Sequence, residues 1–274
     1  MSLRKFTWIT AVLALAAVAA MTAGCGSNSS LGPSANATSR VRVFNALGCP
    51  AALTVDVLQA SNSVSLNPAG SVAYGKLSSY VLSRSGNNIN TNVYAGGTTL
   101  NPLAPQVTVN LDPHNSGSSD GTFTVVVSGV CGQFGNPAPQ IKRFIDNPVT
   151  PAGGQALVRL VNLCPDAGPI APYALIGSPL AAVLIPGFSA NGVAYIDASG
   201  YVAITPIPGQ PLNLQLRTGF PAGQTLPLPP NAGTVTIQAG SAYTLYVYGE
   251  VNPVSGGQAL NLLAAQDAPI TSPP

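Results

Sequence analysis

The residues that could carry chemistry are few in this sequence. His114 is the only histidine, and it lies in a polar, turn-like stretch at residues 112–117. A Ser-His-Asp triad would need this side chain, but no Gly-x-Ser-x-Gly elbow is present to supply the nucleophile. We therefore interpret His114 as a solvated loop residue and predict no catalytic residues of this kind.

Carboxylates and metal ligands also lack a catalytic spacing. Glu250 is the only glutamate, so no pair of glutamates exists for acid–base catalysis. Asp112 and Asp120 share a Gly/Ser-rich loop, but their spacing does not match a calcium loop that ends in glutamate. Asp56 is expected on the polar side of a strand, as a surface carboxylate. No Cys-x-x-Cys, paired histidine or phosphate-binding glycine loop occurs, so the sequence predicts no metal site and no cofactor.

Three tyrosines, Tyr243, Tyr246 and Tyr248, cluster on one predicted strand. Tyr243 shares a face with Leu245 and Val247 and is expected in the core. The other two are expected on opposite faces, so that at least one is exposed. An exposed ring could stack on a sugar, but packing against the sheet is the favoured interpretation.

The low charge of the chain excludes one class of partner. Charged residues make up 7% of the sequence, against roughly 25% in an average soluble protein. The chain has 10 Lys and Arg and 8 Asp and Glu, and two of the basic residues, Arg4 and Lys5, lie in a predicted leader. The remaining charges balance, and no basic patch is present that could bind phosphates. Nucleic acid is therefore not an expected partner.

The N-terminus has the pattern of an export signal. Arg4 and Lys5 precede an apolar run at residues 6–20, which is short for a transmembrane helix. The small residues at 22–24 followed by Cys25 resemble a bacterial lipobox, although Thr22 stands where leucine is usual. We predict that residues 1–24 are a cleaved signal peptide and that Cys25 is diacylated, which would attach the protein to the membrane through lipid. The alternative is secretion after cleavage at Ala17-Val18-Ala19.

Residues 25–39 are expected to form the lipidated cysteine and a flexible linker, because the stretch is polar and has no periodicity. Gly26 rather than aspartate follows the cysteine. By resemblance to bacterial lipoproteins, this favours sorting to the outer membrane. The predicted location is the bacterial cell envelope.

The rest of the chain is organised around a strand that occurs twice. Val-Arg-Val-Phe-Asn at 41–45 returns as Val-Arg-Leu-Val-Asn at 158–162, and a Cys-Pro pair follows each copy. Short runs of β-branched and aromatic residues alternate with Gly, Pro, Asn and Ser, which predicts strands and turns. In the first repeat, residues 40–149, the expected strands are 40–45, 53–58, 72–81, 89–94, 107–111, 123–130 and 141–145.

The second repeat, residues 155–270, matches the first in the same order, which indicates a duplication. Val55-Asp56-Val57 is replaced by Tyr173-Ala174-Leu175. The other matched segments are 72–74 with 193–195, 80–81 with 201–202, 89–93 with 212–216, 107–109 with 235–237, 123–125 with 243–245, and 146–148 with 267–269. We expect two tandem sandwiches that bury positions such as Val43 with Leu160 and Tyr74 with Tyr195, and that pack on each other.

The repeated strand, the Cys-Pro or Pro-Asp-Ala after it, the Val-Asp-Val strand, and then Val-Ala-Tyr and Tyr-Val resemble the domain of unknown function 4397. This family consists of bacterial surface and lipoprotein modules, often in tandem. The resemblance implies an Ig-like β-sandwich and a surface location, and it implies no activity. The fold class expected is therefore all-β, with two tandem Ig-like sandwiches; seven short strands in a repeat of this length fit that class.

Two function classes remain open at this point. The first is a non-enzymatic envelope module that binds an envelope protein or a glycan, or acts as a scaffold; low charge, tandem sandwiches and a tether favour it. The second is a carbohydrate-active or other envelope enzyme with carboxylates contributed by both repeats. Convergence of carboxylates in a cleft would favour the enzyme.

Three cysteines remain if Cys25 is lipidated, so at least one is unpaired within a monomer. We favour a disulfide between Cys49 and Cys131, because both lie in the first repeat and Val251 stands where Cys131 would recur. In a plain Ig strand order these two loops lie at opposite poles, so the bond would require a different strand arrangement. The alternative, Cys49 with Cys164, would join equivalent loops across a pseudo-twofold axis.

Overall fold

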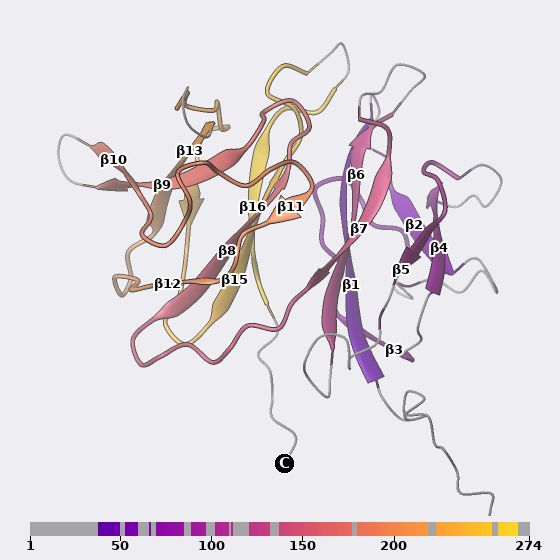
Figure 1. The fold of residues 1–274 in the computed structure, drawn as a ribbon, viewed down its shortest axis with the longest axis horizontal. Coiled ribbons are helices and arrows are strands. Elements are labelled where there is room, and N and C mark those ends of the chain that lie inside the picture. Colours follow the sequence, from indigo (N-terminus) through magenta and orange to yellow (C-terminus); the bar gives the residue numbers. More distant parts are fainter. Residues whose placement is uncertain are drawn as a thin grey trace, which may run out of the picture. The chain divides into compact units, whose positions relative to one another are not determined.

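The computed structural model describes residues 38–49, 53–59, 66, 70–84, 89–96, 102–109, 111, 121–131, 137–176, 180–218, 223–253 and 257–267. Within these ranges every regular element is a strand and no helix occurs (Figure 1). The prediction of an all-β fold is confirmed, and the strands form several sheets. Residues Asn36–Pro274 form one compact unit, and every contact given below lies inside that unit.

The described part of the first repeat forms two sheets, in the orders β3-β1-β6-β7 and β2-β4-β5. Its strands are β1 (Thr38–Gly48), β2 (Val55–Gln59), β3 (Val81–Arg84), β4 (Ile89–Ala95), β5 (Val107–Val109), β6 (Thr122–Val130) and β7 (Gln140–Ile145). Val41, Val43 and Leu47 alternate along β1 and face a core that also takes side chains from β2, β4, β5, β6 and β7. The two sheets therefore form a sandwich around one apolar core.

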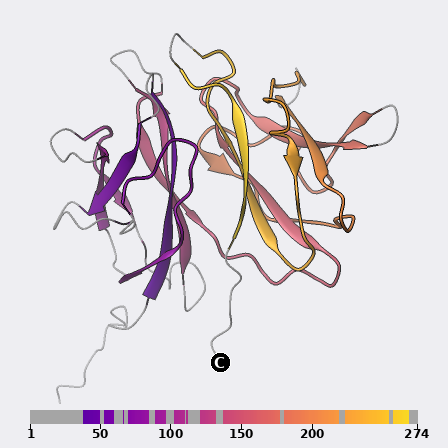
Figure 2. The same cartoon turned by 180° about the vertical axis from the view of Figure 1, so that it is seen from behind.

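The second repeat repeats this arrangement with sheets in the orders β11-β8-β15-β16 and β10-β9-β13-β14, and β12 also pairs with β8 (Figure 2). Its strands are β8 (Ala156–Leu163), β9 (Ile170–Ile176), β10 (Ala181–Leu184), β11 (Asp197–Ala198), β12 (Val202–Ile204), β13 (Leu212–Thr218), β14 (Thr234–Val235), β15 (Ala242–Tyr248) and β16 (Asn261–Gln266). Val158, Leu160 and Leu245 lie in its core.

A parallel strand pair lies at the centre of each repeat. β1 runs parallel to β6, and β8 runs parallel to β15; Arg42 is opposite Thr124 in the first pair, and Arg159 is opposite Thr244 in the second. The outer strands β7 and β16 then add antiparallel to β6 and β15. The carboxyl ends of β1 and β6 consequently meet at the same end of the sheet, which a purely antiparallel sandwich would not allow.

The asparagine that ends the repeated strand motif joins the strand to the loops of the same repeat. Asn45 Nδ2 donates to the carbonyl oxygens of Leu53 and Val72, at 2.8 and 2.9 Å. Asn162 Nδ2 donates in the same way to Gly168 and Val193, also at 2.8 and 2.9 Å. Both asparagines are fully buried, so these bonds satisfy amide groups that would otherwise be costly to bury.

The registers correct several of the sequence matches. Val55 bridges Val72, and Ile170 bridges Val193, so Val55-Asp56-Val57 corresponds to the segment that begins at Ile170 and not to Tyr173-Ala174-Leu175. Short alternating stretches are easily misaligned because a shift of two residues preserves the alternation, although the match with Tyr173 was three residues out of place. By the same reasoning Val235 corresponds to Val109 rather than Val107, because they pair with the equivalent residues Leu212 and Ile89.

The predicted strand at 72–81 was wrong in extent. Only isolated bridges form at Val72 and Leu77, and β3 begins at Val81. A turn at Tyr74 and Gly75 interrupts the segment. Gly75 has a φ of +67°, and a Cβ there would lie 2.8 Å from the Tyr248 hydroxyl oxygen, so a residue with a side chain would be both strained and overcrowded.

Candidate functional site

The most organised polar cluster in the described chain lies between the two repeats. In β1, Val41 and Val43 point into the core of the first repeat, so Arg42 points to the opposite face because side chains alternate along a strand. Arg159 takes the same position in β8, between Val158 and Leu160. Both arginines are buried, with 2% and 4% exposure, and a buried guanidinium requires partners.

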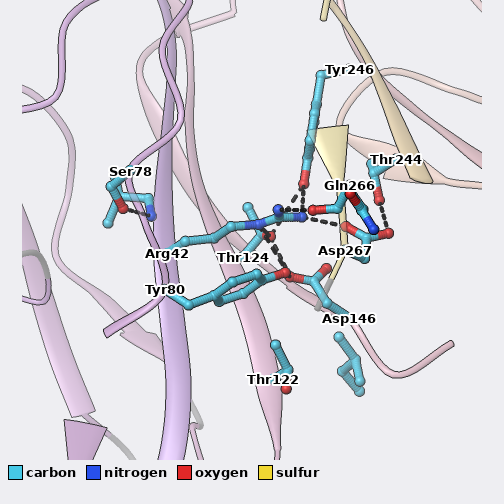
Figure 3. Close-up of polar contacts among 12 residues, drawn as sticks. Arg42, Ser78, Tyr80, Thr122, Thr124, Asp146, Thr244, Tyr246, Gln266 and Asp267 are labelled. Carbon is cyan, nitrogen blue, oxygen red and sulfur yellow. Dashed lines mark hydrogen bonds and ion pairs between the residues drawn. The ribbon is translucent and has the colours of Figure 1, made fainter. Parts of the chain in front are cut away.

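Arg42 reaches from the first repeat into the second (Figure 3). Its Nε donates to Thr124 Oγ1 in its own repeat at 2.8 Å. Its Nη1 donates to the Gln266 carbonyl oxygen at 3.1 Å, and its Nη2 donates to Asp267 Oδ1. The guanidinium also lies over the Tyr80 ring, 4.4 Å from the ring centroid. One side chain therefore joins strands β1 and β6 to the end of β16.

Arg159 makes the reciprocal set of contacts. Its Nε donates to Thr244 Oγ1 in its own repeat at 2.7 Å. Its Nη1 donates to the Ile145 carbonyl oxygen at 2.6 Å, and its Nη2 donates to Asp146, both in the first repeat. Its guanidinium lies 4.8 Å from the centroid of the Tyr201 ring. The two arginines thus exchange partners across a pseudo-twofold axis.

Each carboxylate is held by groups of its own repeat as well. Asp146 Oδ2 accepts hydrogen bonds from the Tyr80 hydroxyl at 3.0 Å and from Thr124 Oγ1. Asp267 Oδ2 accepts from the Tyr201 hydroxyl and from Thr244 Oγ1, each at 2.7 Å. Both carboxylate side chains have no solvent exposure. We call the whole set the inter-repeat network: Arg42, Tyr80, Thr124, Asp146, Arg159, Tyr201, Thr244, Tyr246 and Asp267.

One member breaks the symmetry. Tyr246 stands in β15 where β6 has Val126; each lies two residues after the threonine that the two strands share. The Tyr246 hydroxyl accepts a hydrogen bond from Arg42 Nη2 at 3.2 Å and donates to Thr124 Oγ1 at 3.2 Å. Its ring packs on Phe44, with centroids 4.7 Å apart. The Tyr246 hydroxyl therefore adds hydrogen bonds to the Arg42 half of the network that the Arg159 half lacks a tyrosine to form.

Burial and charge shift the acid–base behaviour of these groups. Burial alone would lower the pKa of Arg42, but Tyr246, Asp146 and the other acidic neighbours raise it above its ordinary value. Burial raises the pKa of Asp267, and the neighbouring Asp146 adds to this, against the effect of the two arginines. Burial likewise raises the pKa values of Tyr80 and Tyr201. The arginines therefore stay charged and the tyrosines stay protonated while the protein is folded.

An apolar cluster continues the contact beyond the network. On β1, Phe44 and Ala46 share a face with Arg42; on β8, Val161 and Leu163 share a face with Arg159. The other members are Val126, Phe144, Tyr246 and Tyr248. Strands β1, β6, β8 and β15 are thus buried on both faces, which explains why three consecutive residues of β6, Val125, Val126 and Val127, are apolar.

The expectation for Tyr246 and Tyr248 was wrong. Residues two apart in a strand lie on the same face, and both rings are buried between the repeats, with 0% and 7% exposure. Neither ring is exposed as a sugar-stacking platform. Tyr243 is buried in the core of the second repeat, as predicted.

The shared positions divide between two environments. Val43 and Leu160 are buried in the repeat cores, as predicted. Tyr74 and Tyr195 are only half-buried, because they lie at the border between the repeats. The Tyr74 ring packs edge-on against Tyr248, with centroids 5.6 Å apart, and the Tyr195 hydroxyl lies 3.2 Å from Ser128 Oγ. These tyrosines extend the contact and do not fill the core of their own repeat.

Cys49 and Cys131 form a disulfide in the structure, with Cα atoms 4.8 Å apart. Parallel pairing removes the topological objection, because Gly48 and Val130 are in register and the two cysteines follow these residues. The strand arrangement therefore differs from the plain Ig order. The alternative partner, Cys164, is a buried free thiol, and burial raises its pKa, so this thiol is poorly reactive.

The register also corrects the match of the two Cys-Pro pairs. Asn45 Oδ1 accepts from the Leu47 backbone N–H at 3.1 Å, and Asn162 Oδ1 accepts from the Cys164 N–H at 3.0 Å. Cys164 therefore occupies the position of Leu47, which places Asp166 at the position of Cys49.

Asp166 replaces the missing disulfide with hydrogen bonds. Its carboxylate oxygens accept from the backbone N–H groups of Val251 and Asn252, both at 2.8 Å. Val251 is the residue that stands where Cys131 would recur. The same end of the sandwich is thus closed covalently in one repeat and by a carboxylate in the other.

Of the remaining candidate residues, those that lie in the described part of the chain do not form a site together. Cys25, Asp112, His114 and Asp120 lie outside the described residues, as do the predicted signal peptide and nearly all of the linker. Asp56 is half-buried on the outward side of β2, and Glu250 is buried after β15. Within the described ranges, no group of three or more His, Cys, Asp and Glu residues could hold a metal ion.

The sequence contains one signal for the inter-repeat network. Arg42 and Arg159 stand at the same place in the repeated strand motif, each between two apolar residues, and Asp146 and Asp267 follow equivalent last strands. Charged residues duplicated within buried strands indicate buried partners for one another. The pairing itself was not readable, because each arginine binds the aspartate of the other repeat.

A family model described as Domain of unknown function (DUF4397) matches residues 39–173. This confirms the resemblance noted in the sequence. The match ends within β9, so it covers the first repeat and the beginning of the second. A comparison with curated proteins finds no match.

Proposed function

Residues 39–173 belong to the family of domain of unknown function 4397, whose description assigns no activity, and from this premise we propose that the protein is a non-enzymatic module of the bacterial cell envelope. In this proposal Cys25 carries the lipid anchor, and the two repeats form one rigid body that binds or scaffolds other envelope components. The location proposed is the outer membrane.

The inter-repeat network is the observation that carries this proposal. Its two arginines and two aspartates are almost completely buried and bind one another, so they are sealed from any substrate. Their effect is to fix the repeats to each other, because each guanidinium bonds to both repeats. A fixed pair of sandwiches suits a scaffold, since flexible domains would lose binding energy in becoming ordered.

A carbohydrate-active enzyme is the second candidate, and one observation favours it. Asp146 and Asp267 come from different repeats and meet in the same network, as such an enzyme would require, but both are fully buried, so a glycan could reach them only if the contact between the repeats opened. Asp267→Asn keeps the shape of the side chain and removes its acid–base function. We expect no hydrolysis of purified envelope glycan by the wild-type protein. Release of reducing ends that the folded D267N variant has lost would establish the enzyme instead.

The anchor can be tested separately. Within the described residues, no helix is long and apolar enough to cross a membrane, and Cys25 lies outside them. Two acyl chains give stable attachment where one chain is marginal. We expect Cys25→Ala to move the protein from the membrane fraction to the soluble fraction, measured by immunoblot after fractionation. Retention of a correctly processed C25A variant in the membrane would contradict lipid anchoring.

The binding role requires a partner. Mature protein bound to beads and incubated with envelope extract should retain a defined envelope protein or glycan. A Phe44→Ala variant, in which the contact between the repeats is weakened, should retain less of it. Equal retention by the variant would mean that the rigid pair of repeats is not what the partner recognises.

A further inference from the structure

An apolar groove of about 730 Å³ opens in the second repeat, beside β10. Its lining comes from β9, β10 and the segment between β12 and β13, and it includes Leu184, Ile204 and Ile237. None of its lining residues is charged. A charged ligand would therefore lose its hydration there without finding a partner.

The surface around this groove is unusually apolar for this protein. Six large apolar side chains are exposed in the described part of the chain, and Ile176, Val183 and Ile207 line the groove while Leu180 lies one residue before β10. These four side chains have exposures of 56%, 47%, 69% and 65% respectively. Clustered apolar exposure on a folded protein marks an interaction surface more often than scattered exposure does.

The groove borders a strand with an open edge. β10 lies at the end of its sheet and, among the described residues, pairs only with β9. Its four residues, Ala181-Ala182-Val183-Leu184, include no charge and no proline, the two features by which exposed edge strands commonly avoid pairing. The outer edge of β10 therefore offers backbone N–H and C=O groups to another strand.

We propose that β10 pairs antiparallel with β10 of a second copy of this chain, so that the two sheets become continuous across a twofold axis. A second copy supplies both requirements of the surface at once: backbone groups for the open edge and apolar side chains for the groove. An acyl chain would fill the groove but leave the edge unpaired. Two copies also meet without charge repulsion, because neither β10 nor the groove is charged.

This proposal goes beyond the proposed function and does not depend on it, because it rests on the second repeat alone. A cysteine scan of Ala181, Ala182 and Val183 tests it in the full chain, by oxidative crosslinking of whole cells and non-reducing electrophoresis. Antiparallel pairing brings equivalent residues near the axis into contact, so at least one position should give a covalent dimer. Leu82→Cys is the matched control, because Leu82 is 70% exposed on the edge strand β3, and it should give none.

A second measurement keeps the proposal open to refutation if crosslinking fails for chemical reasons. Sedimentation equilibrium of the purified mature protein should show a dimer, and Val183→Lys should weaken its self-association at least about tenfold, because a lysine on an edge strand opposes pairing. Leu82→Lys should leave the association unchanged. A monomeric wild-type protein, or equal effects of V183K and L82K on self-association, overturns the proposal. If the monomer binds a fluorescent fatty acid and V183K reduces that binding, the groove belongs to an acyl chain instead.

Discussion

Replacing Arg42 by methionine should cost more stability than any surface change in this protein. Methionine keeps much of the apolar stem but removes the guanidinium, which donates to Thr124, to the Gln266 carbonyl oxygen, to Tyr246 and to Asp267. Asp267 then remains buried without its cross-repeat cation. Removing one partner of a buried ion pair costs about 3–5 kcal/mol, which for a unit of this size lowers Tm by about 6–20 °C.

The assay is thermal and urea unfolding of R42M, followed by circular dichroism, with Asp197→Ala as the control. Asp197 also forms an ion pair between the repeats, with Lys142 at 3.4 Å, but the two side chains are 61% and 41% exposed. An exposed pair contributes about 0–1 kcal/mol, so D197A should unfold almost as the wild type does. Comparing R42M with D197A shows whether the loss of stability comes from the burial of the ion pair or only from its position between the repeats.

A double-mutant cycle decides whether the network acts as a unit. Once Arg42 is replaced, Asp267 has lost its cross-repeat partner, so Asp267→Asn should cost less in the R42M background than in the wild type. Coupling energies between contacting residues are typically about 0.5–3 kcal/mol. Additive losses, or a loss below about 1 kcal/mol for R42M alone, would refute the argument that this buried network locks the repeats together.

Three further predictions follow from the same structure. Burial raises the pKa values of six tyrosines. Because the unfolded chain releases these protons near pH 10 and the folded chain does not, the stability of the fold should decrease as pH rises above about 10. Tyrosinate absorbance should then increase together with unfolding, and a gradual titration without unfolding would contradict this. The double variant Asp166→Cys/Val251→Cys should form a second disulfide, found by non-reducing peptide mapping; free thiols at both positions would contradict the assigned correspondence with Cys49 and Cys131. Gly249→Ala should cost about 1–3 kcal/mol, because Gly249 has a φ of +88° and a Cβ there would clash with the Ala259 carbonyl oxygen. Gly153→Ala, whose Cβ would meet nothing within 4 Å, should be neutral in urea unfolding.

The sequence alone determined the class of structure and its internal repetition. Alternating apolar residues between turn-forming residues predict strands because one face of each strand must be buried, and the duplicated motif predicts that Val43 and Leu160 share an environment. The Cys49–Cys131 pairing was also favoured from the sequence, although the strand order that permits it was not known. These inferences depend on local pattern or on order along the chain, both of which a sequence contains.

The tertiary structure decided what covers the second face of the central strands. Arg42 and Asp267 are 225 residues apart in the sequence, and each repeat taken alone contains an arginine and an aspartate that could have been solvated. Only the packing of one repeat's sheet on the other removes water from these arginines and aspartates. The free energy of that contact comes from surfaces of the two repeats, and no local sequence pattern shows that these surfaces meet. For the same reason Tyr246 and Tyr248 could not be assigned to an interface before the two repeats were placed together.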